Sequence, residues 1–377
     1  MTERTLSAGV PEHGGHVKAA VDAVYNWSYD SEVDELRSLY LKGLQLQWIA
    51  HQQLPWAQGI DQARFAASFT LGGIPIQQTR FWHTLSEHTR WDVARRGAAF
   101  MLSNFLHGEQ GALMVAAQLV NAVPHMDGKF YAATQTLDEA RHVEVFARYI
   151  GQLDRVYPIA PALKELLDTT LGVDGWMRKC VGMQVVVEGL ALYTFRDMRE
   201  TTEEPLLKQL LTYVSRDEAR HTAFGIKYLS AVVPTLTAQE RAELEDFAFE
   251  AARMLIDSRR GATLNDAFLQ MWREAGVDPA DVGRALSEDQ AKLQAAIAAR
   301  GGRLGPVSGF VVPTLRRIGL LSERAADHFR HMFDAMNVAS RGADGVSRNP
   351  LDSLVELPED LEAWATGGQF AASAQGQ

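Results

Sequence analysis

Asp138-Glu139-Ala140-Arg141-His142 is repeated 79 positions further along the chain as Asp217-Glu218-Ala219-Arg220-His221. Two isolated glutamates, Glu109 and Glu188, have the same separation, so each half carries a glutamate followed 30 positions later by a Glu-x-x-His motif. Equal spacing within two segments of one chain indicates an internal repeat. The fold and the chemistry of the protein are both predicted from this repeat.

Helix geometry gives the repeat a chemical meaning. Residues three apart lie on one face of a helix, so the glutamate and histidine of one motif can reach a single metal ion. Thirty residues correspond to half a helix, a short loop and half of the next antiparallel helix, which brings the isolated glutamate to the same level. Four buried carboxylates would repel one another unless two divalent cations neutralised them, and oxygen and nitrogen ligands favour iron or manganese. The candidate catalytic and metal-binding residues are Glu109, Glu139, His142, Glu188, Glu218 and His221.

Charged neighbours of these ligands suggest supporting roles. Asp138 and Asp217 directly precede a ligand glutamate, and each is expected to accept the free N–H of the other motif's histidine. Arg141 and Arg220 are expected to pair with the aspartates and keep them ionised. Gln184 lies one turn before the isolated glutamate of the second half, where it would bond a ligand carboxylate or the substrate.

Apolar periodicity predicts an all-α protein. Long helical patterns cover about residues 92–121, 129–152, 174–200 and 204–231, separated by proline and glycine, and strand signals are nearly absent. We expect a flexible N-terminal arm (1–30), a single helical domain (31–340) whose core bundle covers about 92–232, and a loop with a disordered tail (341–377).

Composition excludes several classes of partner and site. Lys and Arg number 37 against 47 Asp and Glu, a net charge of −10 that argues against nucleic acid or an anionic membrane surface. Cys180 is the only cysteine, which excludes an intramolecular disulfide and thiolate metal clusters. No apolar run is long enough for a membrane span, and residues 1–15 lack the apolar region of a signal peptide. The expected location is therefore the cytoplasm.

The ligand pattern, over about residues 92–232, resembles the ferritin-like dinuclear non-haem iron carboxylate superfamily. The resemblance implies a ferritin-like four-helix bundle with additional N- and C-terminal helices. It further implies two iron ions, or one manganese and one iron, and O₂ as co-substrate, with substrate oxidation through a peroxo-diferric intermediate. An external electron donor, either a ferredoxin or a reductase, and a homodimer are also implied.

Departures from the superfamily's patterns narrow the branch. Phe146 stands where ribonucleotide reductase small subunits carry a radical tyrosine. Ala191 and Leu192 stand where multicomponent monooxygenases and desaturases carry a threonine. Val214 stands where arylamine N-oxygenases carry an extra histidine ligand. What remains is an oxygen-activating enzyme of a less common branch, distinct from ferritins proper.

The function expected from the resemblance is a di-iron monooxygenase that hydroxylates or N-oxygenates a small organic molecule in a biosynthetic pathway. Two alternatives stay open. A fatty-acyl desaturase or hydroxylase would have a long, narrow apolar tunnel past the metals, and a non-catalytic iron-binding subunit would take up metal without consuming O₂ in response to substrate. Residues one turn from the ligands are expected to line the substrate pocket: Phe105, Leu106, Leu113, Phe146, Leu192 and Phe224.

Overall fold

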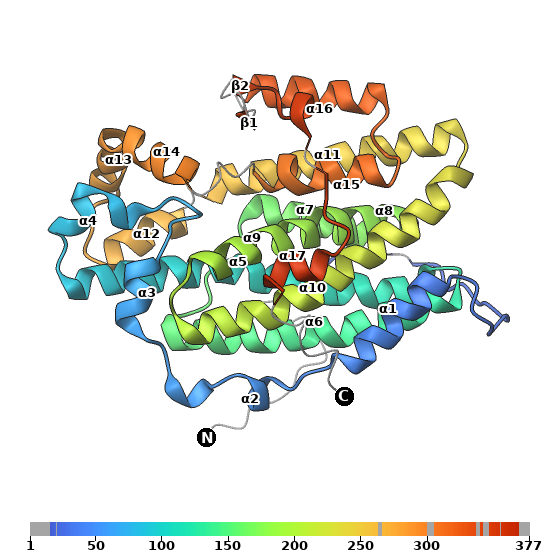
Figure 1. Cartoon of the computed structure of the whole chain (residues 1–377), viewed down its shortest axis with the longest axis horizontal. Helices are drawn as coiled ribbons and strands as arrows, with labels where there is room; N and C mark the ends of the chain where they lie inside the picture. Colours follow the sequence, from blue (N-terminus) through green and yellow to red (C-terminus); the bar gives the residue numbers. More distant parts are fainter. Residues whose placement is uncertain are drawn as a thin grey trace.

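The computed structural model describes residues 16–19, 21–262, 266–299, 305–336, 340–341, 347–354 and 356–368. Four long helical segments form its core (Figure 1). They are α5 (Glu87–Ala122), α6 (Met126–Leu153), the continuous run of α8 (Trp176–Cys180), η3 (Val181–Val187) and α9 (Glu188–Thr201), and α10 (Pro205–Val232). These bounds lie within a few residues of the four helices expected from the sequence, which confirms the predicted bundle.

Local signals explain where these helices begin. The side chain of Ser86 caps α5 by accepting a hydrogen bond from the Thr89 N–H. Pro205 occupies the first turn of α10, and the preceding Glu204 accepts hydrogen bonds from two backbone N–H groups of that turn. The helices α6 and α10 each contain 28 residues. Their bounds differ by the spacing of the sequence repeat at both ends, so the repeat extends over whole helices.

Shorter helices surround this core. Figure 1 shows α3, α4 and α12–α14 gathered at one end of the bundle, with α11, α15 and α16 along one side. The surrounding helices are α1 (Asp34–Gln45), α2 (Ala50–Gln53), η1 (Trp56–Gln58), α3 (Gln62–Ser68), η2 (Ile76–Gln78), α4 (Arg80–Thr84), α7 (Pro161–Gly172), η4 (Val233–Thr235), α11 (Ala238–Ala262), α12 (Asp266–Glu274), α13 (Pro279–Glu288), α14 (Gln290–Ala299), η5 (Val307–Val311), α15 (Val312–Arg317), α16 (Glu323–Ala335), η6 (Pro350–Ser353) and α17 (Leu361–Thr366).

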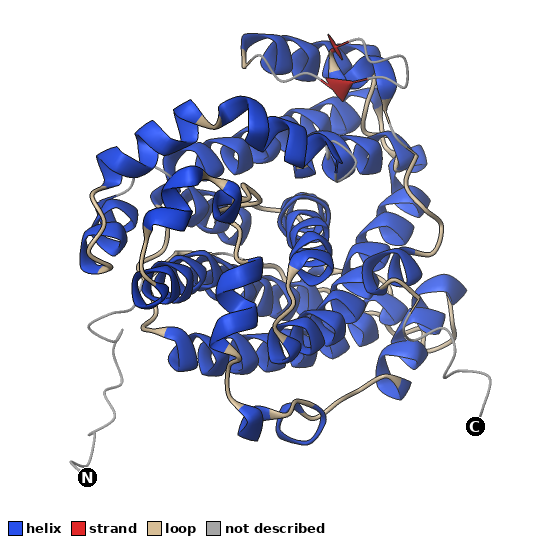
Figure 2. Ribbon diagram, turned by 60° about the vertical axis from the view of Figure 1, so that its left-hand side comes forward, coloured by secondary structure: helices blue, strands red, loops and turns tan. Residues whose placement is uncertain are grey.

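The all-α prediction is confirmed. Over the described ranges, the only named strands are the two-residue β1 (Ser340–Arg341) and β2 (Ser347–Arg348), which pair antiparallel. Figure 2 shows them at the edge of the molecule. No helix of the described part of the chain is both long enough and apolar enough to cross a membrane.

Two hydrophobic clusters fill the interior, and they meet at the level of the candidate ligands. The cluster that contains Tyr131 includes the buried apolar residues that follow Glu109 on α5 and Glu218 on α10. The cluster that contains Phe146 includes the buried apolar residues that precede the same two glutamates. We refer to them as the Tyr131 cluster and the Phe146 cluster. The candidate ligands therefore lie between two apolar layers.

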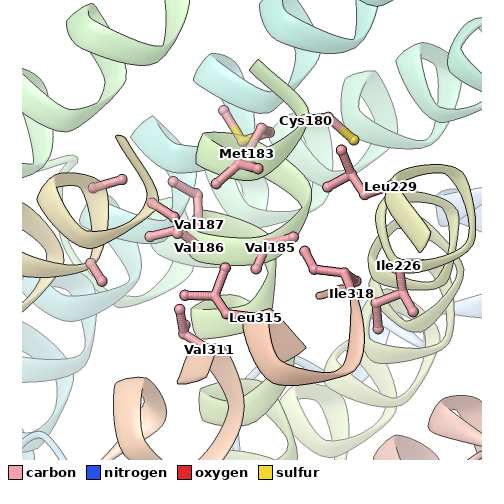
Figure 3. Close-up of a cluster of buried hydrophobic side chains, with 14 of the residues drawn as sticks. Cys180, Met183, Val185, Val186, Val187, Ile226, Leu229, Val311, Leu315 and Ile318 are labelled. Carbon is pink, nitrogen blue, oxygen red and sulfur yellow. The ribbon is translucent and has the colours of Figure 1, made fainter. Parts of the chain in front are cut away.

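The segment η3 is a π-helix inside the third long helix. All seven of its residues are buried. Figure 3 shows its valines facing α10 on one side and the second π-helix, η5, with α15 on another. This packing explains the apolar sequence that precedes Glu188, since three helical neighbours cover it.

The prediction for residues 341–377 is wrong in part. Residues 361–366 form the helix α17, which buries Leu361 and Ala365, and Arg199 donates a hydrogen bond to the Ala365 carbonyl at 3.1 Å. Six residues are too few to show helical periodicity, so the tertiary contacts with α9 and α10 decide the conformation. Of the expected tail and arm, residues 342–346, 355, 369–377, 1–15 and 20 lie outside the described residues, and the described part of 16–30 contains no helix or strand.

Replacing Gly225 by alanine tests the close contact between α10 and η3. A Cβ atom at Gly225 would lie 2.6 Å from Cβ of Gln184, and neither atom is the end of a flexible side chain. We expect Gly225→Ala to destabilise the protein by about 1–3 kcal/mol and to lower the melting temperature in calorimetry. Gly151→Ala on α6 is the matched control, because a Cβ there meets nothing within 4 Å. Equal melting temperatures for the two variants would contradict the close contact.

Candidate metal centre

The structure brings the six expected ligands together as two overlapping groups of four. The first group is Glu109, Glu139, His142 and Glu218, and the second is Glu139, Glu188, Glu218 and His221. Within each group, one ligand atom from every residue lies within 4.8 Å of the others, and all are buried. Glu139 and Glu218 belong to both groups. The arrangement therefore has the form of two adjacent cation positions with two shared carboxylates.

The two histidines face the carboxylates through the same nitrogen. His142 Nδ1 lies 3.2 Å from Glu109 Oε2 and 3.0 Å from Glu218 Oε1. His221 Nδ1 lies 3.1 Å from Glu188 Oε2 and 3.0 Å from the nearer oxygen of Glu139. The two halves of the centre are thus related by an approximate two-fold axis, as the sequence repeat requires.

Charge in the cluster is balanced by proton uptake. Burial, with Glu218 next to it, raises the pKa of Glu109 well above its usual value, and burial with Glu139 next to it does the same for Glu188. Burial would lower the pKa of His142, but its hydrogen bonds to surrounding carboxylates raise it well above the usual value. The raised pKa values of Glu109 and Glu188 indicate that the cluster lacks positive charge, and two divalent cations would supply it.

The shared glutamates also fit cations. Burial alone would raise the pKa of Glu139 and of Glu218, but the neighbouring imidazoles lower both. Glu139 Oε2 and Glu218 Oε1 are buried, and although His142 Nδ1 lies 3.3 Å and 3.0 Å from them, neither oxygen accepts a well-directed hydrogen bond from the described residues. Buried carboxylate oxygens are normally satisfied, so these two are suited to ligate metal. A set of carboxylate oxygens and imidazole nitrogens suits iron or manganese.

The other nitrogen of each histidine meets the aspartate of the opposite motif. His142 Nε2 lies 3.3 Å from Asp217 Oδ2, and His221 Nε2 lies 3.4 Å from Asp138 Oδ2. An aspartate in this position accepts a hydrogen bond from Nε2–H, which fixes the tautomer and leaves Nδ1 free to ligate. The crossed pairing is the one expected from the sequence.

Two arginines neutralise the aspartates. Arg141 donates hydrogen bonds to both Asp138 and Asp217, and so does Arg220, which approaches Asp217 to 2.6 Å. Burial alone would raise the pKa of Asp217. The charge of Arg220 is the main influence that lowers it, and the pKa of this carboxyl lies well below its usual value. Asp217 is therefore held ionised.

Sequence reasoning missed two residues that follow α1. Gln47 Nε2 donates to Asp138 Oδ1 at 2.9 Å, and Trp48 Nε1 donates to Asp217 Oδ2 at 2.6 Å. Both precede the repeat by about 90 positions and carry no motif, so no local signal connects them to the centre. Trp48 also lies under the Arg141 guanidinium, with Cζ 4.8 Å from the ring centroid.

Gln135 is a third missed residue, and here the sequence held a signal. Its amide donates to Glu188 Oε1 at 2.7 Å and to Glu139 Oε1 at 3.1 Å. Gln135 lies one turn before Glu139, as Gln184 lies one turn before Glu188. Gln184 contacts Gln135 at 3.4 Å rather than a ligand carboxylate. The two amides therefore form one hydrogen-bonded pair beside the centre.

The expected pocket residues do not form a single wall. Phe146 and Leu106 belong to the Phe146 cluster, against which Phe105 packs. Leu192 and Phe224 belong to the Tyr131 cluster, and Leu113 is half-buried and belongs to neither. One turn on either side of a ligand leads to opposite ends of the centre, which is why the set divides.

Phe195 was missed and completes an aromatic group. Its ring centroid lies 4.7 Å from that of Phe105 and 5.3 Å from that of Phe146. It follows Glu188 by two turns, a spacing that could have placed it on the same face. Three phenylalanines from three helices therefore meet at one end of the centre.

Asp217→Asn tests the support of the histidine. The amide lacks the charge that orients the His142 Nε2–H, so we expect the affinity for Fe(II) or Mn(II) to fall by about 10–100-fold in equilibrium dialysis. Asp168→Asn on α7 is the control, because Asp168 lies at the surface, where it pairs with Lys164. An unchanged affinity in Asp217→Asn would contradict the assigned role.

Metal-induced stabilisation is expected to increase with pH. Groups whose pKa is raised on folding stabilise the protein only while protonated, so the metal-free protein loses stability as the pH rises through these values. Glu109, Glu188, His142 and His221 all have a raised pKa. Bound cations replace the protons, so the rise in melting temperature caused by Mn(II) should be larger at about pH 8 than at about pH 6.5. A rise independent of pH would contradict this electrostatic description.

Comparison with known proteins identifies the family. Residues 36–279 match the family model described as P-aminobenzoate N-oxygenase AurF. One similar solved structure is a variant of an R2-like ligand-binding oxidase with an aerobically reconstituted Mn/Fe cofactor, at 20% identity, 71% coverage of this chain, 94% of that chain and a TM-score of 0.43. Another is an R2-like ligand-binding oxidase with an aerobically reconstituted metal cofactor after photoconversion, at 19% identity, 71% and 94% coverage and a TM-score of 0.42. No curated protein sequence matches the chain.

The family match spans well over half of the chain. It confirms the expected oxidoreductase class, a dimetal oxygenase that uses O₂ and acts on a small organic substrate. Val214, at the position of the extra histidine ligand, is fully buried in the Phe146 cluster, and this departure does not remove the chain from the family. The chain belongs to the family of P-aminobenzoate N-oxygenase AurF.

Proposed function

We propose that the six residues of the candidate metal centre hold two metal ions and that the enzyme transfers oxygen to the nitrogen of an aromatic amine. When bound, the metal ions supply the activation of O₂. Glu139 and Glu218 would help to hold both ions, because each belongs to both ligand groups. The activity that gives the family its name, N-oxygenation of p-aminobenzoate, supports the choice of nitrogen as the acceptor.

The two ends of the centre differ although the repeat makes them equivalent. Phe105 in the first half corresponds to Gln184 in the second half, and Phe146 corresponds to Gly225. Gln135 in the first half corresponds to Val214 in the second. One end is therefore apolar, with Phe105, Phe146, Phe195 and Val214 around it, and we call it the apolar end. The other, with Gln135, Gln184 and Gly225, is the polar end.

The polar end is occupied by the protein's own contacts. Gln135 donates to two ligand carboxylates, and Gln184 packs so closely on Gly225 that a Cβ would be 2.6 Å away. These contacts hold the carboxylates in place, and the amides of Gln135 and Gln184 are hydrogen-bonded to each other. A substrate approaching from this side would have to break them.

The apolar end is the side we assign to the substrate. Phenylalanine rings pack well against an aromatic ring and exclude water from it. Here they come from α5, α6 and α9, one or two turns from Glu109, His142 and Glu188 respectively. An aromatic amine held with its ring against these side chains and its nitrogen toward the ligands would meet activated oxygen in a dry environment. The asymmetry between the ends is the observation that carries this assignment.

The remaining expectations stay predictions from the sequence. An external electron donor, a ferredoxin or reductase, is expected to reduce the metals, and a homodimer and a cytoplasmic location are expected as well.

The apolar end also supports aromatic substrates over the long acyl chain of a desaturase, because three aromatic rings meet there.

The test is oxygenation of an aromatic amine by the Fe(II)-loaded protein. Reduced protein is mixed with O₂ and either p-aminobenzoate or uncharged aniline, and products are identified by mass spectrometry while O₂ is recorded with an electrode. We expect O₂ consumption that depends on the amine and a product oxygenated on nitrogen. Ring-hydroxylated products alone, or O₂ consumption that no amine changes, would contradict the proposal.

Two variants separate the metal centre from the substrate side. Glu188→Ala should lose at least one metal ion and all turnover, whereas Glu144→Ala, exposed on α6, should keep both. Phe195→Trp should keep both metals and lose turnover, because the larger ring fills the apolar end. Full activity in Phe195→Trp would place the substrate elsewhere.

A further inference from the structure

A line of aromatic side chains connects the polar end of the centre with the protein surface. The Tyr131 ring stacks on Phe224 with centroids 4.6 Å apart, and Phe224 lies 5.6 Å from Tyr228. Tyr228 stacks on Trp176 at 4.4 Å. The four residues come from α6, α10 and α8, so the line is formed by tertiary packing and is not visible as a sequence motif. None of them is used by the proposed oxygenation.

The inner end of the line adjoins the candidate ligands. Phe224 lies one turn after His221 on α10, and Tyr131 lies two turns before Glu139 on α6. The side chain of Tyr131 is buried, and its hydroxyl has no hydrogen-bond partner among the described residues. The rings of Tyr131 and Phe224 therefore stack on each other between the ligand-bearing parts of α6 and α10.

The outer end opens on a surface groove of about 400 Å³. Trp176, Tyr228 and His125 are among the residues that line it. Tyr228 Oη lies 2.9 Å from Nδ1 of the half-buried His125 and 3.4 Å from the His125 backbone N–H. The phenol can thus donate to the imidazole while it accepts from the backbone. Burial raises the pKa of Tyr228, so the phenol keeps its proton at neutral pH.

We propose that Tyr228, with His125 as its proton acceptor, donates one electron to the oxidised metal centre when no substrate is bound. This inference rests on the dimetal oxygenase function proposed above. One electron passes from Tyr228 through Phe224 and Tyr131 to the centre after O₂ has oxidised it, and the centre is reduced by one electron. The phenolic proton moves at the same time from Oη to His125 Nδ1, leaving a neutral tyrosyl radical. A small one-electron reductant in the groove, such as a thiol or ascorbate, then returns an electron to Tyr228, directly or through Trp176, and His125 returns the proton.

Proton acceptors decide which residue of the line holds the oxidising equivalent. A phenol is readily oxidised only if its proton has somewhere to go. Tyr131 has no hydrogen-bond partner among the described residues, whereas Tyr228 has an imidazole nitrogen at 2.9 Å. Phe224 has no acidic proton and is too hard to oxidise, so its ring serves only as the bridge. The radical is therefore assigned to Tyr228.

The experiment exposes Fe(II)-loaded protein, without substrate, to O₂ for one turnover and freezes it for electron paramagnetic resonance. We expect a tyrosyl radical whose hyperfine pattern changes in protein grown on ring-deuterated tyrosine. Tyr228→Phe should lose the signal to background, while its ring keeps the stacking and its metal content stays that of the unmodified protein. Tyr149→Phe is the matched control, since Tyr149 is buried on α6 at a similar distance along the chain from the motif, with its hydroxyl bonded to Glu204.

His125→Gln tests the proton step. Glutamine keeps a polar group near Tyr228 but is a much weaker base, so the radical yield should fall although the aromatic line is intact. An unchanged radical in Tyr228→Phe, a radical on Trp48 or Tyr149, or no radical in the unmodified protein would overturn the inference.

Amine oxygenation is measured separately. Oxygenation without the radical refutes this inference alone, and the radical without oxygenation refutes the proposed reaction alone.

Discussion

The burial of four carboxylates and two imidazoles in a dry helical interior is the constraint on which the rest of the structure depends. Each of these charges would be costly alone, and together the carboxylates repel. The protein meets this cost with histidines that contact the carboxylates, aspartates behind the histidines and arginines behind the aspartates. The helices α5, α6, α9 and α10 must therefore keep a fixed register, because a shift by one residue would turn a charged ligand into an apolar layer.

The repeat makes this register symmetric, and the substrate side that we propose is defined by where the symmetry is broken. Ligands, aspartates and arginines obey the two-fold relation, but the positions one turn away from them do not. Phenylalanine and valine at one end face glutamine and glycine at the other. A symmetric centre can thus bind substrate on one side, while the other side holds the carboxylates and adjoins the aromatic line toward the surface.

The ligand set could be predicted because each motif lies on one helix and the spacing of 30 residues is set by a hairpin. The crossed aspartate–histidine pairs followed from the same repeat. Gln47 and Trp48 could not be predicted, because their contacts span 91 and 169 positions and depend on how α1 docks. The π-helix before Glu188 was also missed, since a run of valines has no period that separates it from an α-helix. The division of the pocket residues required knowing which helices run in the same direction, as α5 and α10 do and as α6 and α9 do. The helix α17 was too short to recognise.

Anomalous diffraction at the iron absorption edge, on crystals of the Fe(II)-loaded protein, would locate the metal ions. We expect two peaks between the four helices. One should lie among Glu109, Glu139, His142 and Glu218, and the other among Glu139, Glu188, Glu218 and His221. A single peak, or peaks bound by Asp138 and Asp217 in place of the glutamates, would contradict this expectation.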